Sequence, residues 1–150
     1  MSIYDSYKLS SGLNYDKITH MAFTNYRILI YSEAPDKLME FYRDVLGFEL
    51  LNKLDIPGDY GYMLKVVGDL NVWIGKHSEI KGKAKENFRH LFNVYPTEGV
   101  DHWHNKIKDL PQVTIVAKPF LAPFSTPENQ VWFCTFLDPE GNCWQFVGKK

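Results

Sequence analysis

The sequence predicts an α+β fold built from two copies of one strand-helix-three-strand (βαβββ) unit. The main observation is an internal repeat, because the same order of apolar strand-like runs and one amphipathic helix occurs twice along the 150 residues. Two local signals support it: a helix end at residues 41–48, sequence FYRDVLGF, and a tight turn inside residues 136–142, sequence FLDPEGN. One unit alone cannot bury both faces of its sheet, so two units side by side, or exchanged between chains, are expected.

The first unit is expected at about residues 25–77, after an N-terminal arm, 1–24, that shows no clear period. Its helix has apolar residues at helical spacing, with Pro35 preset for a first turn and Gly47 as a left-handed stop. In order, the expected strand, helix and three strands are residues 26–31, 35–46, 48–54, 62–67 and 71–75.

The second unit is expected at about residues 88–148, after a linker that contains several lysines. Its last two strands meet at the DPEGN turn, in which proline fixes φ and glycine accepts φ > 0. The proline-rich stretch 118–127 is expected to form a long loop with exposed aromatic residues, serving as a lid, an interface or a plain connector. In order, the expected strand, helix and three strands are residues 89–94, 100–110, 113–118, 131–137 and 143–147.

Composition indicates a compact protein, because 45% of the residues are apolar and 15% are aromatic. The net charge of −1 gives no footprint of a nucleic-acid binder. No apolar run is long enough to span a membrane and the N-terminus lacks the order of a signal peptide, so a cytoplasmic location is expected. Cys134 and Cys143 are expected to be reduced thiols. The tyrosine-rich arm and the apolar loop around Phe120 and Phe124 favour a two-fold symmetric homodimer.

The helix end at 41–48 and the DPEGN turn together resemble the vicinal oxygen chelate superfamily, which contains glyoxalase, bleomycin-resistance and extradiol-dioxygenase relatives. The resemblance covers roughly residues 25–148. It implies that the strands of the two units form one curled mixed sheet around a central cavity, with the helices outside. Function should be sought in that cavity.

Strand alternation predicts which side chains face the cavity. In the first and last strands of each unit, the large apolar residues are assigned to the helix side. This leaves Arg27, Trp73, Arg89 and Gln145 facing inward near the cavity floor. Metal-dependent members of the family place their ligands at about these positions. Only Gln145 offers a ligand here, since arginine stays protonated and an indole has no lone pair to give. The resemblance therefore implies a site without a metal or other cofactor.

Histidine is the alternative source of metal ligands, and the chain has five. His90 would turn inward if its strand slipped by one residue, and it would then form half of a metal site with Gln145. The other interpretation keeps His90 on the helix side of the sheet. His102 and His104 lie two residues apart on the second helix, so they point to different faces and cannot share an ion.

Two inward arginines among aromatic side chains predict an anionic ligand, because a buried guanidinium is costly without a partner. The alternative is an internal salt bridge to Glu49 or Asp55. The predicted function is the binding of a small, anionic, partly apolar molecule; whether a reaction is catalysed stays open, and no catalytic residue is assigned. The competing hypotheses are a metal-dependent glyoxalase-like lyase, isomerase or dioxygenase, and a drug- or toxin-sequestration protein. The expected ligand-binding residues are Arg27, Tyr62, Trp73, Arg89, Trp132, Phe136 and Gln145.

Overall fold

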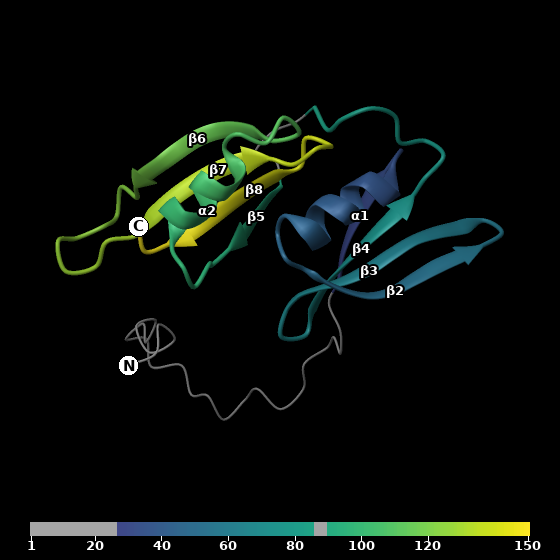
Figure 1. Cartoon of the computed structure of the whole chain (residues 1–150), viewed down its shortest axis with the longest axis horizontal. Coiled ribbons are helices and arrows are strands. Elements are labelled where there is room, and N and C mark those ends of the chain that lie inside the picture. The colour runs from purple at the N-terminus through teal and green to yellow at the C-terminus, as the bar shows by residue number, and fades with distance from the viewer. Residues whose placement is uncertain (1–26, 86–89) are drawn as a thin grey trace, which may run out of the picture.

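The structure, a computed structural model, describes residues 27–85 and 90–150 and contains two four-stranded sheets, each with one helix packed on it (Figure 1). The predicted α+β fold and each predicted strand and helix are confirmed, with ends shifted by a few residues. The first unit contains β1 Arg27–Ser32, α1 Pro35–Asp44, β2 Glu49–Ile56, β3 Asp59–Val67 and β4 Leu70–Lys76. The second unit contains β5 Leu91–Val94, α2 Val100–Ile107, β6 Thr114–Leu121, β7 Trp132–Leu137 and β8 Cys143–Gly148. The expected arm, residues 1–24, lies outside the described residues.

The two sheets have the same strand order, which confirms the internal repeat. The first sheet has the order β1-β4-β3-β2 and the second has the order β5-β8-β7-β6. In each sheet the first strand pairs in parallel with the last, and the other neighbours are antiparallel. The sheets curl but do not close, so the described part of one chain does not enclose the expected central cavity. Neither described helix has the length and apolar character needed to cross a membrane.

Helix α1 shows how the local sequence sets the layers. Pro35 occupies its first turn, and the apolar side chains at helical spacing, including Leu38 and Tyr42, are buried against the first sheet. The helix ends at Asp44, earlier than expected, and the N–H of Val45 bonds to the last turn. Gly47, at φ 76°, then turns the chain into β2. Neither helix of the described residues covers the opposite face of the first sheet.

The proline-rich stretch is only partly the loop that the sequence predicts. Pro119, Phe120 and Leu121 continue β6, and the loop begins after them. Proline has no N–H to donate, but β6 is an edge strand and its pairing with β7 shifts register between Ala117 and Phe120. An irregular position on an edge strand is where a sheet accepts proline.

The DPEGN turn joins the two units through a buried carboxylate. Asp138 accepts hydrogen bonds from the Tyr42 hydroxyl of α1 at 2.6 Å, from the Asn142 side chain at 2.8 Å, and from the backbone N–H groups of Glu140 and Asn142 at 2.9 Å each. Burial raises the pKa of Asp138, although these hydrogen bonds favour its charged form. Burial beside this carboxylate also raises the pKa of Tyr42. Glu140 adds a second link by accepting from the Ser32 hydroxyl at 2.6 Å.

Trp144 is the main apolar link between the units. Its indole, 2% exposed, lies at ring-centre distances of 5.3 Å from Tyr42, 5.7 Å from Phe48 and 4.9 Å from Phe92. Its Nε1 donates to the Tyr42 hydroxyl at 3.2 Å. The helix sides of both units therefore merge into one continuous core.

Candidate functional site on the open faces of the two sheets

Each sheet has a face opposite its helix, called here the open face. In β1, Ile28 and Ile30 pack in the core, whereas Leu29 and Tyr31 are 51% and 42% exposed. The same alternation in the other strands confirms that Arg27, Trp73 and Gln145 lie on open faces.

The open face of the first sheet is organised in rows of cross-strand neighbours. One row contains the cations Arg27 and Lys65 on either side of Asn71. The next row is apolar and consists, in the order β1, β4, β3, of Leu29, Trp73 and Met63. The third row consists, in the same order, of Tyr31, Gly75 and Gly61. The face thus places positive charge directly beside an apolar surface.

The indole of Trp73 lies against the two glycines. A Cβ atom on Gly75 would overlap Nε1 of the indole and lie 3.1 Å from its Cδ1, and a Cβ on Gly61 would lie 2.6 Å from its Cζ2. The N–H edge of the indole, which carries these three atoms, therefore lies close to the backbone at both positions. Tyr31 borders the same place, since its Cε1 would lie 3.3 Å from a Cβ on Gly75. Neither glycine has a positive φ, so the backbone conformation does not require glycine at these positions. At position 75 it is the contact with the indole that leaves no room for a larger side chain.

The open face of the second sheet has a polar row in the equivalent place. Asn93, Gln145 and Thr135 are cross-strand neighbours, and the Gln145 amide donates to the Thr135 hydroxyl at 2.9 Å. Because Trp73 and Gln145 occupy the same position in their units, an aromatic ring on one sheet corresponds to an amide on the other. The rows on either side hold mostly apolar residues, including Leu91, Leu137, Val147 and Phe133.

The pairing registers correct the expected match between Arg27 and Arg89. Leu29 pairs with Trp73 and Asn93 pairs with Gln145, so the structural counterpart of Arg27 is Leu91, two residues after Arg89. Arg89 itself lies outside the described residues. Of the expected pair of arginines, the structure places Arg27 on the open face, where its side chain is exposed.

Three expected binding residues, Tyr62, Trp132 and Phe136, lie on the helix side of their sheets. The Tyr62 hydroxyl donates to Asp36 of α1, which raises the pKa of Tyr62 and helps to lower that of Asp36. Phe136 is fully buried, 4.8 Å from the ring of Phe146. Trp132 packs against the same core. Alternation explains the difference, since each is an even number of residues from a core neighbour on its strand.

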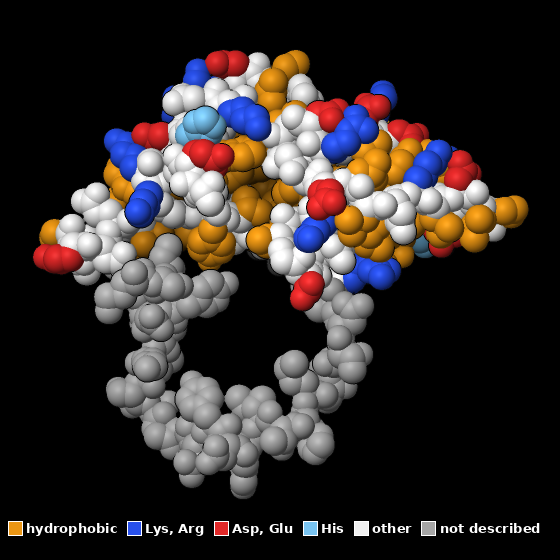
Figure 2. Space-filling model, turned by 60° about the horizontal axis from the view of Figure 1, so that its bottom comes forward, with side chains coloured by type: hydrophobic (Ala, Val, Ile, Leu, Met, Phe, Trp, Pro, Cys, Tyr) orange, Lys and Arg blue, Asp and Glu red, His pale blue; other side chains and the backbone are white. Residues whose placement is uncertain are grey.

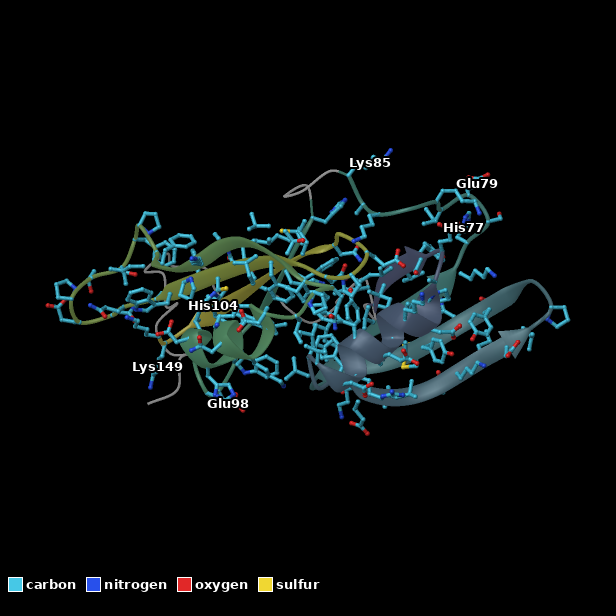
Figure 3. All side chains as sticks on the ribbon, turned by 45° about the horizontal axis from the view of Figure 1, so that its top comes forward. His77, Glu79, Lys85, Glu98, His104 and Lys149 are labelled. Atoms are coloured by element: carbon cyan, nitrogen blue, oxygen red, sulfur yellow. The ribbon has the colours of Figure 1, made fainter. Side chains whose placement is uncertain are left out.

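The described histidines do not gather at one site. Figure 3 shows His77 at the end of β4 and His104 on α2, in different units. His90 is exposed in the turn before β5. Within residues 27–85 and 90–150, no three histidine, cysteine or acidic side chains come close enough to hold a metal ion.

The described open faces carry exposed apolar side chains such as Leu29 and Tyr31. Figure 2 shows hydrophobic side chains gathered between the two halves of the molecule, with basic and acidic side chains interspersed around them. A pocket of about 460 Å³ lies elsewhere, near the start of α1, where Asp36, Tyr60 and Lys76 are among its lining residues.

Comparisons with known proteins agree with this architecture. The family model described as the glyoxalase/bleomycin resistance protein/dioxygenase superfamily matches residues 17–146. A superfamily member from Sphaerobacter thermophilus has a TM-score of 0.63 and 19% identity, covering 85% of this chain and 98% of that one. TioX from Micromonospora sp. ML1 has a TM-score of 0.62 and 18% identity, covering 85% and 100%. Lactoylglutathione lyase from Agrobacterium tumefaciens has a TM-score of 0.55 and 21% identity, covering 83% and 92%. A comparison with curated proteins found no match.

Proposed function

The chain belongs to the glyoxalase/bleomycin resistance protein/dioxygenase superfamily, and we propose that it binds a small, anionic, partly apolar molecule on its open faces without the family metal. The observation that carries this proposal is the position of Trp73. The indole occupies the centre of the first open face, and the guanidinium of Arg27 belongs to the next row. An apolar surface beside an arginine suits a molecule with an apolar body and an anionic group.

The chemistry of the central side chains supports binding without a metal. The paired central positions hold Leu29 and Trp73 in the first sheet, and Asn93 and Gln145 in the second. Leucine and an indole offer no ligand atom, so the two amides would have to hold an ion by themselves. Catalytic zinc sites use three protein ligands drawn from histidine, carboxylate and thiolate. These described residues do not fit the family metal, which supports binding over the metal-dependent lyase and dioxygenase alternatives.

We predict that purified protein carries no stoichiometric transition metal and still binds apolar anions. Elemental analysis should find well below one zinc, nickel, manganese or iron per chain. Titration of the same sample with 2-naphthoate and with trans-decalin-2-carboxylate, both apolar anions, should show saturable binding of at least one. One metal ion per chain, removed together with binding by a chelator, would contradict the proposal and redirect attention to Asn93 and Gln145.

A homodimer is proposed as the form in which the open faces are covered. Leu29, Phe120 and Phe124 are exposed large hydrophobic residues, and an apolar surface of this kind marks an interaction site. Two-fold symmetry lets one patch serve both subunits. Light scattering should give twice the chain mass of 17.5 kDa across the micromolar range. A constant monomer mass would count against this part of the proposal. The cytoplasmic location stays a prediction.

A further inference from the structure

We propose that Trp73 is a stacking platform and that the ligand of the open face is an aromatic carboxylic acid. Its ring would lie on the indole while its carboxylate reaches Arg27. This inference rests on the proposed function and narrows it from apolar anions in general to planar ones. Three features of the first sheet carry it: the glycine seat under the indole, the exposed apolar border, and the cation one row away.

The glycine seat lets the N–H edge of the indole approach the sheet. Gly75 lies nearest to Nε1 and Cδ1, and Gly61 lies near Cζ2. These glycines are direct cross-strand partners on β4 and β3. Trp73 is only half-buried, so part of the indole stays accessible on the open face. An accessible indole face matches a planar ring in offset stacking better than a puckered aliphatic ring does.

The border of the platform is apolar and open. Leu29 and Tyr31, on β1, are about half exposed, and Met63 lies on the other side of the indole. A ring stacked on Trp73 would touch these side chains at its edges. The surface is therefore broad enough for a ring that is larger than the contact with the indole alone.

The position of the cation sets the distance between ring and anion. Arg27 precedes Leu29 by two residues on β1, so its row is about 7 Å from the row of Trp73. Lys65 lies in the same row, with Glu49 as its other cross-strand neighbour. None of the ion pairs found among the described residues involves Arg27. A guanidinium with no carboxylate partner in the described part of the chain favours a carboxylate on the ligand.

Three probe molecules distinguish the contribution of the planar ring to binding from that of the charge. 2-Naphthoate has a planar ring and an anion, trans-decalin-2-carboxylate has the anion on a puckered frame, and 2-naphthamide has the ring without the charge. We expect 2-naphthoate to bind about two- to twelvefold more tightly than the decalin acid, which is the range for one aromatic pair. It should bind about tenfold or more tightly than the amide, which is the range for a charged hydrogen bond.

Two variants test the residues. Gly75→Ala should displace the indole and remove the preference for 2-naphthoate over the decalin acid, with no backbone strain of its own. Arg27→Met should weaken both acids about tenfold or more and leave 2-naphthamide unchanged. The matched controls are Lys37→Met, at an exposed position on α1, and Trp132→Phe, on the helix side. They should change neither the preference for 2-naphthoate over the decalin acid nor the affinity for the two acids. Trp73→Phe, which keeps a smaller ring, serves if Gly75→Ala folds poorly.

Each outcome has one meaning. Equal binding of the two acids, or a preference that neither Gly75→Ala nor Trp73→Phe reduces, overturns the stacking platform but leaves the binding of apolar anions intact. Absence of binding by both acids overturns the proposed function as well. If Trp73→Phe instead dissociates a dimer and no probe binds, the open face is an interface between copies, and the ligand proposal is overturned.

Discussion

Asp138→Ala is expected to lower the free energy of unfolding by about 3–5 kcal/mol, the largest loss for a single polar group in this fold. The carboxylate is 2% exposed and accepts four hydrogen bonds, from Tyr42, Glu140 and twice from Asn142. Alanine leaves these donors without their acceptor. The Tyr42 hydroxyl is the most affected, because it is fully buried between the two units. Chemical denaturation followed by circular dichroism measures the loss.

Two matched variants distinguish the loss of the Asp138 hydrogen bonds from the loss of a carboxylate charge alone. Tyr42→Phe removes one donor and should cost about 1–2 kcal/mol. Asp109→Ala removes a carboxylate that is exposed at the end of α2 and should stay within about 0.5 kcal/mol of the parent protein. A loss below about 1 kcal/mol for Asp138→Ala would show that water or a neighbouring side chain replaces the carboxylate, and the turn would then not be the polar link between the units.

The pH dependence of Asp138→Asn follows from the raised pKa. Burial favours the protonated carboxyl in the folded state, so Asp138 contributes stability below its ordinary pKa of 3.8 and loses that contribution as pH rises through the folded value. Asparagine stays neutral at every pH. The stability of the parent protein relative to Asp138→Asn should therefore fall as pH rises above about 4. Parallel denaturation curves at several pH values provide the comparison.

Alternation along the strands predicted the sides of the sheets correctly because a strand has an exact period of two. Arg27, Trp73 and Gln145 lie where this argument placed them. Tyr62 and Phe136 were chosen instead for their aromatic rings, and each is two residues from a core residue of the same strand. The same alternation, applied to these strands, places both on the helix side.

The pairing of residues across neighbouring strands was harder to predict than the face on which a residue lies within its own strand. The repeat was aligned through the similar segments 27–30 and 89–92, but the hydrogen-bonded partners match Arg27 with Leu91. Lys65 was missed for the same reason, since only the register of β3 on β4 brings it into the row of Arg27. The glycine seat had one local signal: Gly75 follows Trp73 by two residues and shares its face. The second glycine, Gly61, comes from another strand.

Trp144→Ala is expected to separate the unfolding of the two units as well as to lower stability. The substitution removes a fully packed indole, which costs about 3–5 kcal/mol for a buried Trp or Phe side chain. Trp144 contacts Tyr42 and Phe48 of the first unit and Phe92 of the second. The cavity therefore opens at the junction. The Tyr42 hydroxyl also loses the indole N–H that bonds to it at 3.2 Å.

Phe146→Leu is the matched control, because Phe146 lies on the same strand and face but packs against Trp103 and Phe136 of its own unit. It should lower stability while both units continue to unfold together. Hydrogen exchange read separately for peptides of β1 to β4 and of β5 to β8 distinguishes the two effects. In Trp144→Ala the two sets should exchange with different free energies of opening, whereas in Phe146→Leu they should stay equal. Equal protection in both variants would mean that the polar contacts of Asp138 and Glu140 are enough to couple the units.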